Sequence, residues 1–151
     1  MGSCNILGAF SGGGGGGLTV NKLQGTITSD FTTTSTSFVD TGLDLTLSNQ
    51  TDGNALIIAT FNGINSTDAY SARFNLSDDG TQITSTNVSA NNVTGVVVGN
   101  LADAVCLTTI ADTDGSVISV YTKSAGGGAG TAKMIYSANN YTPQIIAMEF
   151  Y

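Results

Sequence analysis

The sequence contains no histidine, and this absence excludes several kinds of active site. Nucleophilic triads of the Ser-His-Asp and Cys-His types need an imidazole base, and the commonest zinc sites need imidazole ligands. Two cysteines, Cys4 and Cys106, cannot hold a structural zinc ion without histidine. Glu149 is the one glutamate, and several aspartates stand at or near turn glycines, so we expect no pair of carboxylates placed for glycoside hydrolysis. We expect a protein that is not an enzyme and that needs no metal or cofactor.

Charged residues are also scarce, at 10% of the chain, where about 25% is usual. The net charge is −7, and the four basic residues are scattered along the sequence: Lys22, Arg73, Lys123 and Lys133. Neutralising phosphates needs concentrated Lys and Arg, so we expect neither nucleic acid nor an anionic membrane as a partner. No apolar run approaches the roughly 18 residues of a membrane span. The first residues lack the basic region and apolar core of a signal peptide, and we expect a protein made in the cytoplasm.

Residues 1–23 differ in composition from the rest of the chain. They begin with a short apolar cluster made of Ile6, Leu7, Ala9 and Phe10. A glycine run follows, made of Gly12, Gly13, Gly14, Gly15, Gly16 and Gly17. Polyglycine loses much conformational entropy on ordering, so this run predicts a flexible hinge. We interpret residues 1–23 as an arm whose apolar tip docks in another protein, and residues 24–151 as the folded domain.

Beyond the arm, the sequence predicts strands separated by tight turns. In the segment 43–47 the three leucines alternate with Asp44 and Thr46, which is the period of a strand with one buried face. Turn signals are Asp52-Gly53, Asn62-Gly63, Asp79-Gly80 and Asp114-Gly115. The predicted strands are 25–30, 36–39, 42–48, 54–62, 69–77, 81–88, 93–99, 104–110, 116–123, 131–137 and 144–150. No segment has a helical period, and the fold class expected is an all-β, antiparallel sandwich of two sheets.

Some of the predicted strands are apolar on both faces, namely the runs 55–61, 96–98 and 145–148. A small sandwich has only one core, so a second apolar face indicates contact with another subunit. The expected subunit interface consists of Ile57, Phe61, Val97, Ile146, Met148 and Phe150. We therefore predict a homo-oligomer with no stable monomer.

Several segments resemble the TNF-like jelly-roll domains of tailed-phage structural proteins. The segments that carry this resemblance are Phe31 to Leu47, Ala55 to Ala59, Ala72-Arg73-Phe74, Asp79 to Ile83 and Ile146 to Phe150. It covers about residues 24–151, behind a glycine-rich N-terminal segment of the kind that often precedes such domains. The resemblance implies a jelly-roll sandwich, a homotrimer and no cofactor. On this interpretation the chain is a decoration, head-fibre or tail-fibre protein of a virion, and the arm binds the major capsid protein or another virion protein.

Two other interpretations fit the composition. One is an extracellular filament subunit in which Leu18-Thr19-Val20 is a strand donated to the next subunit. Glycosylation would accompany export, and Asn-x-Ser/Thr triplets begin at Asn49, Asn65, Asn75, Asn87, Asn92 and Asn140. The other is a receptor-binding or glycan-binding tip that uses exposed aromatic side chains, with Tyr121, Tyr136 and Tyr141 as candidates.

Overall fold

The structure, a computed structural model, describes residues 20–48, 54–65, 71–91, 102–111, 115–125, 130–137 and 142–150. These residues form strands and no helix. The strands are β1 (Val20–Thr26), β2 (Phe31–Thr33), β3 (Val39–Thr46), β4 (Asn54–Asn65), β5 (Ser71–Asp78), β6 (Thr81–Asn91), β7 (Ala102–Ala111), β8 (Val117–Ser124), β9 (Ala132–Ile135) and β10 (Gln144–Phe150). In the described ranges, accordingly, no helix is long and apolar enough to cross a membrane.

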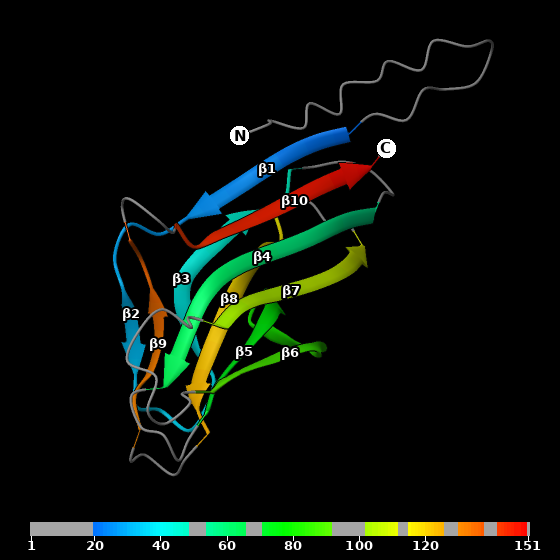
Figure 1. The fold of residues 1–151 in the computed structure, drawn as a ribbon. Coiled ribbons are helices and arrows are strands. Elements are labelled where there is room, and N and C mark those ends of the chain that lie inside the picture. Colours follow the sequence, from blue (N-terminus) through cyan, green and yellow to red (C-terminus); the bar gives the residue numbers. More distant parts are fainter. Residues whose placement is uncertain are drawn as a thin grey trace, which may run out of the picture.

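The strands form two sheets that pack face to face (Figure 1). The six-stranded sheet has the order β1-β10-β4-β9-β2, and β7 pairs with the other edge of β4. The four-stranded sheet has the order β3-β8-β5-β6. All pairings are antiparallel, which confirms the predicted two-sheet sandwich.

The pairing pattern is that of a jelly roll. β1 pairs with β10, β2 with β9, β3 with β8, β4 with β7 and β5 with β6. Each strand of the first half therefore pairs with its counterpart counted from the other end of the chain. Such nesting arises when one long antiparallel ribbon wraps around a core, which is how two Greek keys combine into a jelly roll.

The core lies between the two sheets and is filled by alternate residues of the strands. Leu43 and Leu45 on β3, and Leu47 directly after it, are buried while Asp44 and Thr46 are exposed, as the period of two predicted. Phe61 of β4 and Phe74 of β5 meet across the interior, with ring centroids 4.6 Å apart. Because these two strands belong to different sheets, this aromatic contact joins the layers.

Two of the predicted turns can be compared with the structure. Asp79 and Gly80 join β5 to β6 with φ angles of 47° and 80°, and Asp78 pairs with Thr81, so the predicted tight hairpin is confirmed. The turn predicted at Asn62-Gly63 is wrong, because both residues lie inside β4. They pair with β7 on one edge and with β9 on the other, and strand pairing on both edges keeps this backbone extended.

The folded domain begins earlier than predicted. β1 starts at Val20, within the segment assigned to the arm, and Leu23 pairs with Ala147 and packs against the core. The short strand β2 was not predicted, because two of its three residues are threonines and carry no apolar alternation. The predicted strand 93–99 lies outside the described residues.

Glu149 closes one end of the sandwich with a buried carboxylate. Its side chain is 0% exposed, and its Oε1 accepts the Ser48 N–H at 2.7 Å. Its Oε2 accepts the Ser48 hydroxyl at 2.6 Å and Asn21 Nδ2 at 2.8 Å. Asn21 belongs to β1, and Ser48 follows β3 of the opposite sheet. One carboxylate thus connects the last strand with the first strand and with the second layer.

Candidate assembly surface

The outer face of the six-stranded sheet carries large apolar side chains. On β4, the residues that alternate with the core positions are Leu56 and Ile58, and both are only half-buried. On β10, Ile146 and Met148 alternate with the buried Ala147 in the same way. Strand register brings them together, because Met148 pairs with Leu56 and Ile146 pairs with Ile58. Paired residues share one face of a sheet, so these side chains form one cluster.

Two more residues extend this cluster along the sheet. Phe150 is half-buried at the end of β10, and its partner Val20 on β1 is 48% exposed. We call the six residues the apolar face: Val20, Leu56, Ile58, Ile146, Met148 and Phe150. Isolated exposed apolar residues are ordinary in soluble proteins, but a contiguous cluster on one sheet indicates a binding surface.

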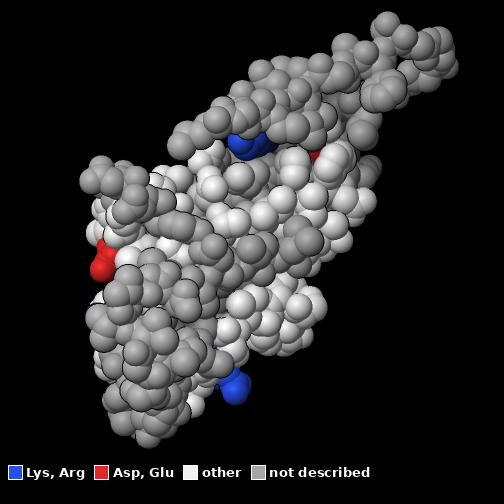
Figure 2. Space-filling model, in the orientation of Figure 1, with Lys and Arg blue, Asp and Glu red and all other residues white. Residues whose placement is uncertain are grey.

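Polar residues border the apolar face. Lys22 and Gln24 are exposed on β1, in register with Met148 and Ile146. Gln24 Nε2 donates a hydrogen bond of 3.2 Å to Oε1 of Gln144. An apolar centre with a polar rim is the usual arrangement of a protein interface. Figure 2 views the molecule from this side: the described atoms that are visible over β10 and β4 are mostly white, and a group of blue atoms lies over β1.

The outer face of the four-stranded sheet is different. Its outward positions include Arg73 and Asn75 on β5 and Val117, Ser119, Tyr121 and Lys123 on β8. Asn75 and Ser119 are buried, and Val117, 37% exposed, is the one exposed large aliphatic residue described on this face. The two outer surfaces of the sandwich therefore differ in kind. Only the six-stranded sheet presents an apolar face among the described residues, so self-association driven by apolar burial would use that sheet.

The residues predicted for the subunit interface fall into three groups. Ile146, Met148 and Phe150 lie on the apolar face. Ile57 and Phe61 lie instead in the core of the same chain, with exposed fractions of 0% and 1%, and cannot touch a second subunit in the folded protein. Val97 lies outside the described residues. On β4, the outward side chains are those of Leu56 and Ile58, not those of Ile57 and Phe61. The sequence did not distinguish the two sets, because the run 55–61 is apolar on both faces of the strand.

The other predicted residues are placed as follows. The apolar tip at Ile6, Leu7, Ala9 and Phe10 and the hinge glycines 12–17 lie outside the described residues. Of the aromatic candidates for a receptor tip, Tyr121 and Tyr136 are half-buried and Tyr141 is outside the described residues.

Two observations bear on the filament interpretation. Val20 is already part of β1 and pairs with Phe150 of its own chain. Asn65 and Asn75 are 0% exposed, so these two triplets are inaccessible to a glycan in the folded domain.

Among the described residues, no group of three or more Cys, Asp or Glu side chains is placed to hold a metal ion.

No family model and no curated protein sequence matches the chain.

Proposed function

We propose that this chain is a non-enzymatic structural protein of a virion, which self-associates through the apolar face and is attached to the particle by its N-terminal arm. The observation that supports self-association most directly is the contiguous cluster on β4 and β10, bordered by polar residues of β1. Three copies are proposed because the TNF-like jelly rolls that the chain resembles form trimers. The same resemblance is the basis for the virion.

Burial of the apolar face would favour assembly. Full burial of a large apolar side chain contributes about 1.5–3 kcal/mol. These side chains are mostly half-buried already in one chain, so the remaining gain is about 1 kcal/mol for each. Six of them would contribute about 6 kcal/mol for each copy, which is large compared with the effect of an ordinary surface residue. The polar rim adds hydrogen bonds that fix the orientation of the copies.

A charge placed in the apolar face tests this proposal. Ile146→Lys should convert the oligomer to a monomer, because Ile146 lies beside Ile58 at the centre of the cluster and an unpaired charge in an interface is strongly unfavourable. The matched control is Thr46→Lys, at an exposed position of β3 in the other sheet. Light scattering after size exclusion would measure the mass, and circular dichroism would verify folding. A wild-type chain that is monomeric at micromolar concentration would refute self-association.

The arm is proposed as the attachment to the particle. Three or four apolar side chains at its tip could each contribute about 1.5–3 kcal/mol on burial, and three arms in one trimer would act together through their high effective concentration. Removing residues 1–17 should leave folding and oligomeric state unchanged but abolish co-sedimentation with the particles. If the shortened protein co-sediments as the full chain does, the attachment surface lies on the jelly roll and this part of the proposal is wrong.

A further inference from the structure

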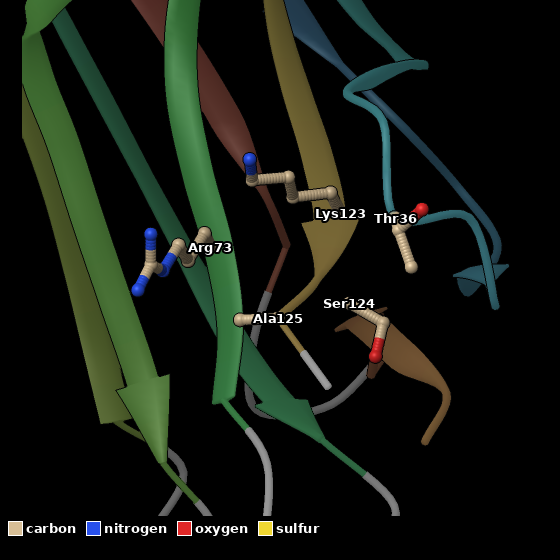
Figure 3. Close-up of a pocket in the computed structure, with 5 residues that line it drawn as sticks. All are labelled: Thr36, Arg73, Lys123, Ser124 and Ala125. Atoms are coloured by element: carbon tan, nitrogen blue, oxygen red, sulfur yellow. The ribbon is translucent and has the colours of Figure 1, made fainter. Parts of the chain in front are cut away.

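A shallow pocket on the four-stranded sheet brings together two of the four cations of this acidic chain. Thr36, Arg73, Lys123, Ser124 and Ala125 line the pocket, which has a volume of about 430 Å³. Arg73 lies on β5 and Lys123 on β8, and Figure 3 shows them projecting from these neighbouring strands. They are direct partners in the strand register, which places their Cβ atoms about 4.5–5.5 Å apart.

This placement is unusual for a protein with a net charge of −7. Like charges directly opposite each other in a sheet are destabilising. In the described part of the chain, neither Arg73 nor Lys123 forms an ion pair with a carboxylate. The nearest carboxylate in register on β3 is that of Asp40, which is opposite Tyr121, and its Oδ1 accepts the Gly42 N–H at 2.9 Å. No ion pair therefore joins either cation to a carboxylate within the described residues.

The surroundings of Lys123 hold it in place without neutralising it. Its Nζ lies 4.5 Å from the centroid of the Phe38 ring, a cation–π contact that leaves the positive charge available. Arg73, on the other side of Lys123, is exposed, and nothing in the described structure fixes its guanidinium. Lys123 is therefore a cation anchored by Phe38, and its neighbour Arg73 is a cation that can adjust its position.

The walls of the pocket are fixed by backbone hydrogen bonds. Ser124 N–H donates to the Ser35 carbonyl at 2.8 Å, and Ala125 N–H donates to the Ser71 carbonyl at 2.8 Å. The segment before Thr36 is held by a turn in which Ser35 N–H donates to Thr33 Oγ1 at 3.1 Å. These bonds join the connection after β2, the end of β8 and the start of β5, so the pocket is built before any ligand arrives.

We propose that this pocket binds a sugar-sized ligand that carries a phosphate group. Arg and Lys are the side chains that recognise such oxyanions, Arg as a bidentate donor and Lys as a point charge. The Thr36 hydroxyl can add a neutral hydrogen bond. The volume exceeds that of a simple ion and falls within the range of about 300–1,000 Å³ of small-ligand sites. The inference goes beyond the proposed assembly role and is independent of it, since the pocket and the apolar face are on different sheets.

Binding of three probes to the full chain tests the proposal: glucose 6-phosphate, glucose and inorganic phosphate. We expect saturable binding of glucose 6-phosphate, seen in two-dimensional NMR as shifts of the Lys123 and Ala125 backbone amides, weaker binding of phosphate and none of glucose. Arg73→Gln and Lys123→Gln should each weaken binding about tenfold or more, since each removes a charged hydrogen-bonding group. The matched control Lys133→Gln, which removes a cation of β9, should bind as the wild type does.

Three results would overturn the proposal. They are the absence of saturable binding of any probe, equal binding of glucose and glucose 6-phosphate, and unchanged affinity in both Arg73→Gln and Lys123→Gln. If phosphate alone binds as tightly as glucose 6-phosphate, the assignment of a sugar-sized ligand is wrong. Ile146→Lys should bind the probe as the wild type does, so failure of the assembly proposal and failure of this one are distinguishable.

Discussion

Replacing Glu149 with alanine would remove a buried carboxylate that accepts hydrogen bonds from β1 and from the segment after β3. The Ser48 N–H would lose its acceptor, and Asn21 Nδ2 would keep only its hydrogen bond of 2.9 Å to the Ser48 hydroxyl oxygen. Both groups lie beside a side chain that is 0% exposed. Hydrogen bonds to charged groups contribute about 1.5–3 kcal/mol each, and a buried group left without its partner costs about 1–3 kcal/mol. Allowing for water that enters the space, we expect a loss of about 3–5 kcal/mol.

That loss is a large part of the roughly 5–15 kcal/mol that stabilises an ordinary domain. Urea denaturation followed by circular dichroism would measure it, at one fixed protein concentration because self-association adds to apparent stability. Glu149→Gln keeps the size and one acceptor oxygen, so it should cost less, about 1–3 kcal/mol. Gln24→Ala, at an exposed position of β1, should change stability by less than about 0.5 kcal/mol.

A double-mutant cycle identifies the partner. Ser48→Ala removes the 2.6 Å hydroxyl bond to Oε2 and keeps the backbone N–H. Combined with Glu149→Gln, it should show a coupling energy of about 0.5–3 kcal/mol, as contacting residues do. If Glu149→Ala unfolds within about 1 kcal/mol of the wild type, or if the two changes are additive, the carboxylate does not connect the layers as we infer.

Four further changes have expected outcomes in the same denaturation assay. Gly25→Ala should cost about 3 kcal/mol or more, because its Cβ would overlap the Asp44 carbonyl oxygen where β1 crosses β3; stability equal to the wild type would contradict that close approach. Gly80→Ala should cost about 1 kcal/mol because of its φ of 80°. Ser77→Ala should leave stability unchanged or raise it by up to about 1 kcal/mol, because its buried hydroxyl has no hydrogen-bond partner among the described residues. Deleting residues 146–151 should abolish folding, because β10 lies between β1 and β4.

The sequence correctly predicted which side chains are buried on strands that have one solvent-exposed face. On β3, Asp44 and Thr46 mark the solvent side, so the leucines between them could only be core. β4 is different, because both of its faces are apolar and no polar residue between 55 and 59 reveals which parity points inward. The prediction chose Ile57 and Phe61 for the interface, whereas the structure places them in the core and puts Leu56 and Ile58 outside. On such a strand, the register with β10 and β7 decides which alternate set of side chains points to the core. Register is a property of the tertiary structure.

The pocket at Arg73 and Lys123 and the hydrogen bonds of Glu149 could not be predicted for a related reason. Both join residues that are far apart in the sequence, such as Arg73 with Lys123 and Asn21 with Glu149. In the sequence the four cations look scattered, and Glu149 looks like a lone acid in a terminal strand. Only the pairing of β5 with β8 and of β1 with β10 brings these groups together.

The pairing of the first strand with the last could link attachment to the particle with assembly through the apolar face. Because the first strand pairs with the last, β1 lies beside β10, whose Ile146, Met148 and Phe150 form half of the apolar face. Val20 contributes to that face and lies within residues 1–23, the segment predicted as the arm, three residues after the glycine run. In an oligomer built on this face, the arms would leave from the rim of the interface, so that several tips could bind one particle together. A binding site on the four-stranded sheet would then remain open to a ligand while the other sheet is occupied by neighbouring copies.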